Sequence, residues 1–250
     1  MEVGYWADIR GRMTTVRYIL AHSGTKCKET YYPLDMSPKG YPFWNGVVKK
    51  EHLEQNPFAN LPYLITEDGK HITQTDAIIN YLGRKLGYWP KNDDDFVKFD
   101  MIAVFASDLG ATVKNIMMEQ PSEKKTEFAK NELIAMMKPF NDFLVKNDTA
   151  FIVGDYLTVV DFNVFKWLDL IRLYQPKIFD GNQALKVWFH NMESELAPCL
   201  ENERKLPMTV RYRSIFDKLP ADKWTPEIKK KYEGLPIQYW GIEGHMGSVE

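Results

Sequence analysis

The chain has 250 residues, of which 44% are hydrophobic and 26% are charged, and these proportions are ordinary for a globular protein and exclude a disordered one. Its 32 basic and 34 acidic side chains give a formal net charge of -2, so there is no electrostatic reason to expect nucleic acid or a membrane surface as a partner. A chain of this length contains one large domain or two smaller ones.

The amino-terminal residues MEVGYWADIRGR include an acid at position 2 and no apolar run, which excludes a secretory signal. No apolar stretch approaches the ~20 residues that a membrane-spanning helix needs. Cys27 and Cys199 lie far apart and match no metal-binding spacing, so we expect two reduced thiols and no metal site. We therefore predict a cytoplasmic protein, or one delivered to an organelle by a signal that the sequence does not reveal.

The first thirty residues alternate between strand and helix patterns. Residues Glu2–Trp6 are short and apolar, as in a strand, and Arg12–His22 carry apolar side chains at helical spacing. Gly24 suits the end of that helix. Residues Cys27–Tyr32 then alternate apolar and polar side chains, which is typical of a half-buried strand. The pattern predicts a βαβ unit.

The next sixty residues predict a loop, a hairpin and a helix. Residues 33–59 are rich in Pro, Gly and Lys and indicate a loop with one short helix near Trp44–His52. Two apolar runs, Leu61–Thr66 and His71–Thr73, are separated by an Asp-Gly turn, which favours a hairpin. Residues Thr75–Leu86 place their apolar side chains on one helical face.

After Pro90 every pattern as far as residue 205 is helical, and no strand signal is present. Thr158 and Asp161 have the spacing of a helix capping box inside an apolar stretch. The predicted helices are Asp94–Met118, Glu123–Lys146, Val159–Tyr174, Gln183–Glu195 and Glu195–Arg204. We predict a domain at residues 1–87, a linker at 88–93, an all-helical domain at 94–218 and an extended tail at 219–250 that lies on the body of the protein.

Several groups of residues resemble motifs of the cytosolic glutathione S-transferase family, and of its mu class most closely. They are Gly4-Tyr5-Trp6 with Ile9-Arg10-Gly11, residues 58–65 (FANLPYLI), residues 72–78 (ITQTDAI), and Gly154 with residues 158–162 (TVVDF). Each is weak alone, but they occur in the family's order over residues 2–218. The resemblance implies an α/β plus all-α protein, with a thioredoxin-like domain that binds glutathione followed by a helical-bundle domain.

The family joins glutathione, a thiol tripeptide, to small hydrophobic electrophiles, and the reactive form of a thiol is the thiolate. The resemblance implies that Tyr5 is catalytic and donates a hydrogen bond to the sulfur anion. The alternative is that Tyr5 is an ordinary strand aromatic. Ala7 is an extra residue relative to the mu pattern. It either lengthens the loop after Trp6 or shifts the strand by one residue, which would turn Tyr5 to the opposite face.

Two further motifs imply a clamp on the peptide backbone of glutathione. The resemblance implies a cis bond between Leu61 and Pro62, which would present the Leu61 backbone to the cysteine of the tripeptide. It also implies that Gln74 and Thr75 bind the γ-glutamyl carboxylate, and a helix N-terminus favours an anion at that position. The alternative for Thr75 is that it only caps the helix.

The remaining glutathione-binding residues implied by the resemblance are Trp6, Trp44, Lys49 and Asn60. Trp44 matches a Trp of the mu loop, but Val48 stands where that loop usually has Lys. Lys49 or Lys50 would therefore contact the glycine carboxylate, unless both are simply solvated lysines.

The resemblance also implies a twofold homodimer. Asp108 aligns with the acid that reaches the partner's glutathione, and otherwise would be an ordinary surface residue. Phe58 matches the aromatic side chain that inserts into the other subunit. Met118 stands where the mu class often has a second Tyr, so we expect it to line an apolar electrophile pocket.

Three functions remain open from the sequence. The first is an active glutathione transferase with a detoxification role, which the retained site residues favour. The second is an inactive transferase fold that binds another protein as a subunit of a larger complex, which Ala7, the longer loop, Met118 and the tail favour. The third is a glutathione-dependent isomerase related to the sigma class.

Overall fold

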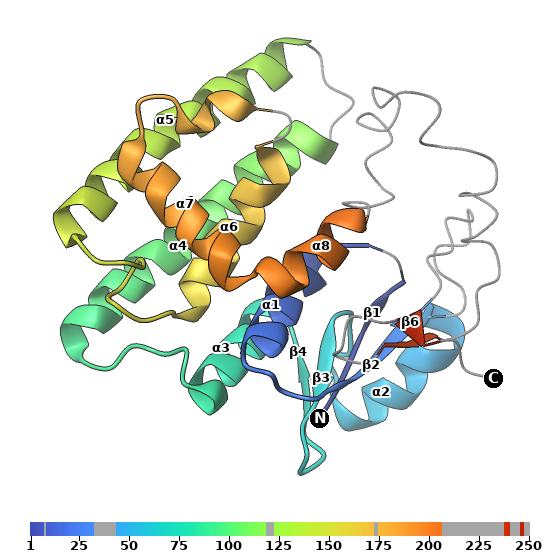
Figure 1. The fold of residues 1–250 in the computed structure, drawn as a ribbon. Coiled ribbons are helices and arrows are strands. Elements are labelled where there is room, and N and C mark those ends of the chain that lie inside the picture. The colour runs from blue at the N-terminus through green and yellow to red at the C-terminus, as the bar shows by residue number, and fades with distance from the viewer. Residues whose placement is uncertain are drawn as a thin grey trace. The chain divides into compact units, whose positions relative to one another are not determined.

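The computed structural model of the chain describes residues 1–7, 9–32, 44–118, 123–172, 175–206, 238–240 and 246–247 (Figure 1). These residues divide into two compact units, and each is described by itself. The first unit comprises the described residues up to Tyr81, residues 198–206, and the two short strands near the carboxyl terminus. The second comprises the described residues between 82 and 197.

The first unit contains a mixed sheet with the strand order β4-β3-β1-β2-β5-β6. Strand β1 pairs in parallel with β2 and antiparallel with β3, and β3 pairs antiparallel with β4. The strands are β1 Glu2–Trp6, β2 Lys28–Tyr32, β3 Tyr63–Ile65, β4 His71–Thr73, β5 Gln238–Trp240 and β6 Met246–Gly247. The predicted βαβ unit and the predicted hairpin are confirmed, and together they form the thioredoxin-like half of the fold.

Helices cover both faces of this sheet. Tyr31 is the register partner of Tyr5, whereas Tyr63 pairs with the preceding residue of β1, so Tyr31 and Tyr63 point to opposite faces. Arg17 contacts Tyr31 on one face, and Trp44 stacks on Tyr63 on the other. The helices of this unit are η1 Gly11–Met13, α1 Thr14–His22, η2 Trp44–Val48, α2 Lys49–Gln55, α3 Thr75–Leu86, which continues past Tyr81, and most of α8 Ala197–Lys205.

The carboxyl-terminal tail contributes two strands that the sequence did not predict. Strand β5 pairs antiparallel with β2, and β6 pairs antiparallel with β5. Without them β2 would present unpaired backbone groups at the sheet edge, and the pairing supplies partners for these groups. The other residues of the predicted tail lie outside the described residues.

The second unit is built from helices packed on one another. Helix α4 packs against α5 and α6, and α5 packs against α7. Their bounds are α4 Asp93–Met118, α5 Glu123–Asn147, α6 Val159–Ile171, η3 Pro176–Phe179 and α7 Gln183–Glu195. The predicted helices are therefore present with ends shifted by a few residues. The last residues of the predicted helix Val159–Tyr174 include 173–174, which lie outside the described residues.

The start of α6 is held by the predicted capping box. The Asp161 carboxylate accepts hydrogen bonds from the Thr158 backbone N–H at 2.9 Å and from the Thr158 hydroxyl at 3.1 Å. It also accepts from the backbone N–H of Ile152 at 2.9 Å and from Trp188 Nε1 at 3.1 Å. Burial raises the pKa of Asp161, and these bonds oppose the rise because they stabilise the charged form. The box therefore fixes the connection before α6 as well as the helix start.

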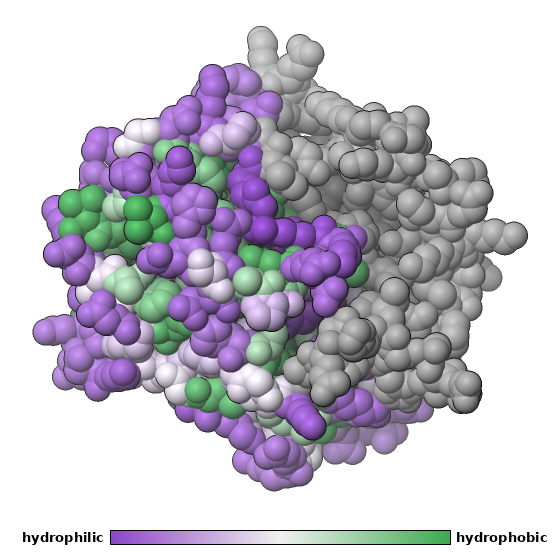
Figure 2. Space-filling model, viewed as in Figure 1, coloured by the Kyte–Doolittle hydropathy of each residue, from purple (hydrophilic) through white to green (hydrophobic). Residues whose placement is uncertain are grey.

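Figure 2 shows that hydrophilic residues cover most of the described surface in this view and that hydrophobic residues form small separate patches. Within the described part of the chain, every helix is too short or too polar to cross a membrane.

Candidate functional site

The register of the sheet brings three predicted site segments to one end of it. Gly4 pairs with Tyr63, and Tyr63 pairs with Thr73. Because β3 runs antiparallel to both neighbours, the residue after Gly4, the residue before Tyr63 and the residue after Thr73 meet at the same end. Those residues are Tyr5, Pro62 and Gln74, so three motifs that lie far apart in the sequence meet at this end of the sheet.

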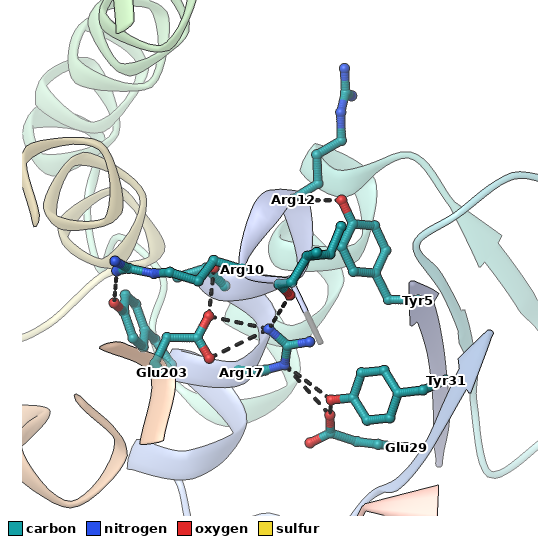
Figure 3. Close-up of polar contacts among 10 residues, drawn as sticks. Tyr5, Arg10, Arg12, Arg17, Glu29, Tyr31 and Glu203 are labelled. Atoms are coloured by element: carbon teal, nitrogen blue, oxygen red, sulfur yellow. Dashed lines mark hydrogen bonds and ion pairs between the residues drawn. The ribbon is translucent and has the colours of Figure 1, made fainter. Parts of the chain in front are cut away.

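The side chain of Tyr5 is directed at the start of the first helix (Figure 3). Its hydroxyl oxygen accepts a hydrogen bond of 2.9 Å from the backbone N–H of Arg12, and the residue is 5% exposed. A hydroxyl that accepts such a bond has its own hydrogen to donate. Accepting an N–H also polarises the phenol and makes it a stronger donor. The arrangement therefore suits a group that stabilises a neighbouring anion.

Gly11 allows the turn before α1 to pass close to the phenol. Its φ is +50°, a left-handed conformation that favours glycine, and a Cβ at this position would lie 2.5 Å from the Tyr5 hydroxyl oxygen. No other residue type fits between this turn and the ring without displacing one of them.

The extra residue Ala7 lies beyond the end of β1. Its backbone N–H donates a 2.8 Å hydrogen bond to the carbonyl oxygen of Tyr32, which extends the pairing of β1 with β2 by one position. Tyr5 remains within the strand and faces the turn at Arg12. This is the facing expected if the extra residue lengthens the loop after Trp6.

The bond between Leu61 and Pro62 is cis, as the resemblance implied. The backbone N–H of Leu61 donates a hydrogen bond of 2.9 Å to the side-chain oxygen of the exposed Asn60. The N–H that would meet a peptide ligand therefore has a local acceptor in this structure, and a ligand carbonyl would have to replace it.

Gln74 and Thr75 join β4 to α3 in a strained and polar connection. Gln74 has a φ of +70°, which is rare for a residue with a side chain and which often marks a ligand-binding position. The Thr75 side chain is 9% exposed, and its hydroxyl oxygen is buried without a hydrogen-bond partner. A buried hydroxyl without a partner is costly, so this atom fits a site that a polar ligand completes.

The predicted tryptophans and Lys49 lie on the other face of the sheet. Trp44 is 3% exposed and packs edge-on against Trp6, with ring centroids 6.3 Å apart. It also stacks on Tyr63 at 6.4 Å and contacts His52 of α2 at 5.7 Å. Lys49, the first residue of α2, is half-buried. Trp44 thus positions α2 from within an aromatic cluster.

Phe58, Asp108 and Met118 lie outside this group. Phe58 is 72% exposed, just before the turn that contains Pro62. Asp108 belongs to the second unit and is exposed on α4. Met118 is the last residue of α4, and its side chain lies outside what the structure describes.

Two features of the site were missed by sequence reasoning. The first is the Arg12 backbone amide, because a main-chain donor leaves no trace in residue type. The second is the role of Gly11, although a glycine directly before a helix and after a polar turn signals a special backbone conformation.

The two cysteines and the potential metal ligands of the described residues supply no competing reactive centre. Cys27 and Cys199 are free thiols, and burial raises the pKa of each to about 12, which disfavours the thiolate. Among the described residues, no group of three or more His, Cys, Asp or Glu side chains is arranged to hold a metal ion.

Comparison with known proteins agrees with this geometry. The amino-terminal domain model of glutathione S-transferases matches residues 1–84, and a carboxyl-terminal domain model matches residues 107–197. Glutathione S-transferase Mu 1 of Macaca fascicularis is 32% identical over 211 residues, covering 83% of this chain and 93% of that protein. Glutathione S-transferase Mu 4 of Homo sapiens is 31% identical over 210 residues, with the same coverage.

A solved structure shares the fold. The crystal structure of the glutathione S-transferase Blo t 8 superposes with a TM-score of 0.75 at 24% identity, covering 85% of this chain and 99% of that one. Domain matches, relatives and fold together show that the chain belongs to the glutathione S-transferase family and has mu-class proteins among its relatives.

Proposed function

We propose that this protein is an active glutathione transferase that joins the thiolate of glutathione to small hydrophobic electrophiles. The observation that carries the proposal is the Tyr5 hydroxyl, held by the Arg12 amide at the sheet end that also bears Pro62 and Gln74. Membership of the family supports the substrate, and the site geometry supports the retention of activity.

The chemical task at this site is to stabilise a sulfur anion. A free thiol has a pKa of about 8.5, so only a few per cent is thiolate at neutral pH. Lowering that pKa by about two units requires roughly 2.7 kcal/mol of preferential stabilisation of the anion. A phenol that donates a charge-assisted hydrogen bond in a mostly buried site supplies much of this. Tyr5 is therefore the catalytic residue in the proposal.

The peptide part of glutathione would be held by main-chain and hydroxyl groups. The γ-glutamyl carboxylate fits the start of α3, where the Thr75 hydroxyl lacks a partner and where free N–H groups carry partial positive charge. The Leu61 backbone would bind the cysteine residue once Asn60 releases its N–H. Lys49 would meet the glycine carboxylate, and Trp6 and Trp44, whose rings pack edge-on, would complete the site.

A homodimer completes the proposal. Phe58 is 72% exposed, although a large aromatic side chain is usually buried. Exposed apolar side chains also form a stripe at helical spacing along α4, made of Val97, Met101 and Val104. Asp108 continues that stripe one turn further on. An apolar stripe that ends in an acid, together with an exposed Phe, suits a partner subunit whose glutathione amine meets Asp108.

The electrophile is expected to be small and hydrophobic, with Met118 as part of its pocket. Cytoplasmic location remains a prediction. The alternative function is a scaffold, an inactive fold that binds another protein. The feature that favours it is the carboxyl-terminal tail, whose strand β5 pairs with β2 and extends the sheet.

Binding and turnover of the wild-type protein separate these functions. We expect retention on immobilised glutathione, elution by free glutathione, and conjugation of a general aryl halide with loss of one thiol per product. A protein that is neither retained nor active would support the scaffold. Turnover of a substrate without loss of glutathione would support the isomerase.

A further inference from the structure

A buried polar cluster in the first unit, which we call the Arg17 cluster, joins α1 and β2 to α8 (Figure 3). It consists of Thr14 and Arg17 from α1, Glu29 and Tyr31 from β2, and Glu203 from α8. All five side chains are buried. None of them belongs to the motifs that identify the family's glutathione site in this sequence.

Glu203 is bound from two sides. Its Oε1 atom accepts a hydrogen bond of 2.6 Å from the hydroxyl of Thr14 and one of 3.2 Å from Nη1 of Arg17. Its Oε2 atom lies 3.4 Å from the same Nη1. Helix α8 is therefore fixed to α1 through a carboxylate whose orientation is determined by two donors on adjacent turns.

Arg17 also contacts two side chains of strand β2. Its Nε donates to the Tyr31 hydroxyl at 3.1 Å and lies 3.7 Å from Oε2 of Glu29, to which the Tyr31 hydroxyl also donates. Burial alone would lower the pKa of Arg17, but Tyr31, Glu203 and Glu29 raise it. Arg17 therefore stays a cation with a fixed plane.

A fourth contact of Arg17, besides those with Glu203, Tyr31 and Glu29, connects the Arg17 cluster to the active site. Nη1 of Arg17 also donates a hydrogen bond of 3.1 Å to the backbone carbonyl oxygen of Ile9. Ile9 opens the turn whose Gly11 passes over the Tyr5 ring and whose Arg12 N–H binds the Tyr5 hydroxyl. The path from Glu203 to the phenol thus runs through one guanidinium and the backbone from Ile9 to Arg12.

Stability alone does not account for such a cluster. The desolvation of buried charges roughly cancels their attraction, so a buried ion pair contributes little net stability compared with apolar residues of the same size. What the pair does supply is a fixed direction, because a guanidinium has its donors in a rigid plane. In this protein one of those donors points at the backbone carbonyl oxygen of Ile9.

We propose that Arg17, oriented by Glu203, is a positioning residue that holds the Ile9–Arg12 turn so that the Arg12 amide meets the Tyr5 hydroxyl. This inference rests on the proposed function, because its consequence is the tuning of a bound thiol. Helix α8 thereby acts on the chemistry through the Arg17 side chain, which binds both Glu203 and the Ile9 carbonyl.

The test measures three quantities: the pKa of the glutathione thiol in the binary complex, kcat, and KM for glutathione. They are measured for Glu203→Gln, for Tyr5→Phe and for the double variant. In the wild-type background we expect Glu203→Gln to lower kcat about three- to tenfold at neutral pH, the size of one hydrogen bond. The thiol pKa should rise, and KM for glutathione should stay the same. In the Tyr5→Phe background Glu203→Gln should change neither kcat nor the thiol pKa, since coupled residues are not additive.

Two controls keep the test decisive. Asp169→Asn also changes a buried carboxylate that pairs with an arginine, Arg172 at 3.1 Å, but it lies in the second unit and should leave the thiol pKa unchanged. Thr14→Val removes only the 2.6 Å bond to Glu203, so it should shift the thiol pKa in the same direction by a smaller amount. It replaces Glu203→Gln in the test if that variant does not fold.

The outcomes separate the two proposals. Suppose that the wild type lowers the thiol pKa and that Tyr5→Phe raises it again. If Glu203→Gln then has no effect on the thiol pKa, or the same effect with Tyr5 and with Phe at position 5, Arg17 does not act through Tyr5. If the wild-type protein does not lower the thiol pKa, the proposed function fails first and this inference fails with it.

Discussion

The backbone N–H of Arg12 and the hydroxyl oxygen of Tyr5 are joined by a hydrogen bond of 2.9 Å, which links the start of the first helix to the end of the first strand. The phenol is therefore oriented by main chain rather than by another side chain. Substitutions that move this turn should change the chemistry even where they leave Tyr5 itself intact.

Gly11→Ala tests this dependence directly. The new Cβ would lie 2.5 Å from the Tyr5 oxygen at a residue whose φ is +50°, so the turn must move. We expect kcat to fall about 10–100-fold, as for other small misplacements of catalytic groups. Gly24→Ala is the matched control, because Gly24 also has a positive φ, +64°, but a Cβ there meets nothing within 4 Å. Gly24→Ala should lose stability without losing kcat, and equal kcat in the two variants would contradict the prediction.

Thr75→Val should weaken glutathione binding without weakening the fold. The Thr75 hydroxyl has no partner in the protein, so replacing it by a methyl group removes an unsatisfied polar atom and should leave the free energy of unfolding unchanged or slightly higher. A hydroxyl bond to a carboxylate contributes about 1.5–3 kcal/mol, so Kd for glutathione should rise about 10–100-fold.

Titration calorimetry and chemical unfolding measure the two quantities for Thr75→Val. Thr75→Ser keeps the hydroxyl and should bind like the wild type. If Thr75→Val binds glutathione as tightly as Thr75→Ser, the Thr75 hydroxyl does not contact the ligand, and its role is confined to the start of the helix.

Stability should fall on the acid side because of His52. Burial lowers the pKa of His52, and the neighbouring His71 lowers it further, while Glu2 and Glu51 oppose this. The folded-state pKa of His52 is therefore below its ordinary value of 6.5, so the unfolded chain binds more protons between the two values. The free energy of unfolding should decrease as the pH falls through 6.5 towards the folded-state pKa.

Urea unfolding at a series of pH values measures this effect. His52→Phe keeps a ring against Tyr63, whose centroid lies 4.3 Å from that of His52, and should flatten the acid-side decrease. His190→Gln changes an exposed histidine of α7 and should leave the decrease in place. The same slope in His52→Phe as in the wild type would assign the decrease to other groups.

Phe58→Ser should shift a dimer towards monomer. The side chain is 72% exposed in the single chain, which is expected if a partner subunit covers it. Analytical ultracentrifugation should show a dimer for the wild type and a weaker association for Phe58→Ser. Phe128→Ser is the matched control, since Phe128 is 70% exposed on α5. Equal association of the two variants would remove Phe58 from the interface.

Much of the fold could be predicted because its signals are local. Strand β1, helices α3 and α7, and the capping box of Thr158 and Asp161 depend on periodicity and on residues within a few positions of one another. The cis bond before Pro62 came from resemblance to the family and not from the residues themselves.

The features that escaped prediction depend on distant residues or on backbone. Arg17 and Glu203 are 186 positions apart, and no pattern in one sequence pairs them. Strand β5 adds to β2 from a tail without a strand pattern. The burial of Trp44 depends on rings from three separate elements, and the donor at Arg12 is main chain.

The central claim is that Tyr5 stabilises the glutathione thiolate, and the most direct measurement is the pKa of the bound thiol. Ultraviolet absorbance of the thiolate in the binary complex is followed against pH for the wild type and for Tyr5→Phe. We expect the wild-type pKa to lie about two units below the ~8.5 of a free thiol, and the Tyr5→Phe value to return close to it with glutathione still bound. The same thiol pKa in both proteins would contradict the assignment of Tyr5 as the catalytic residue.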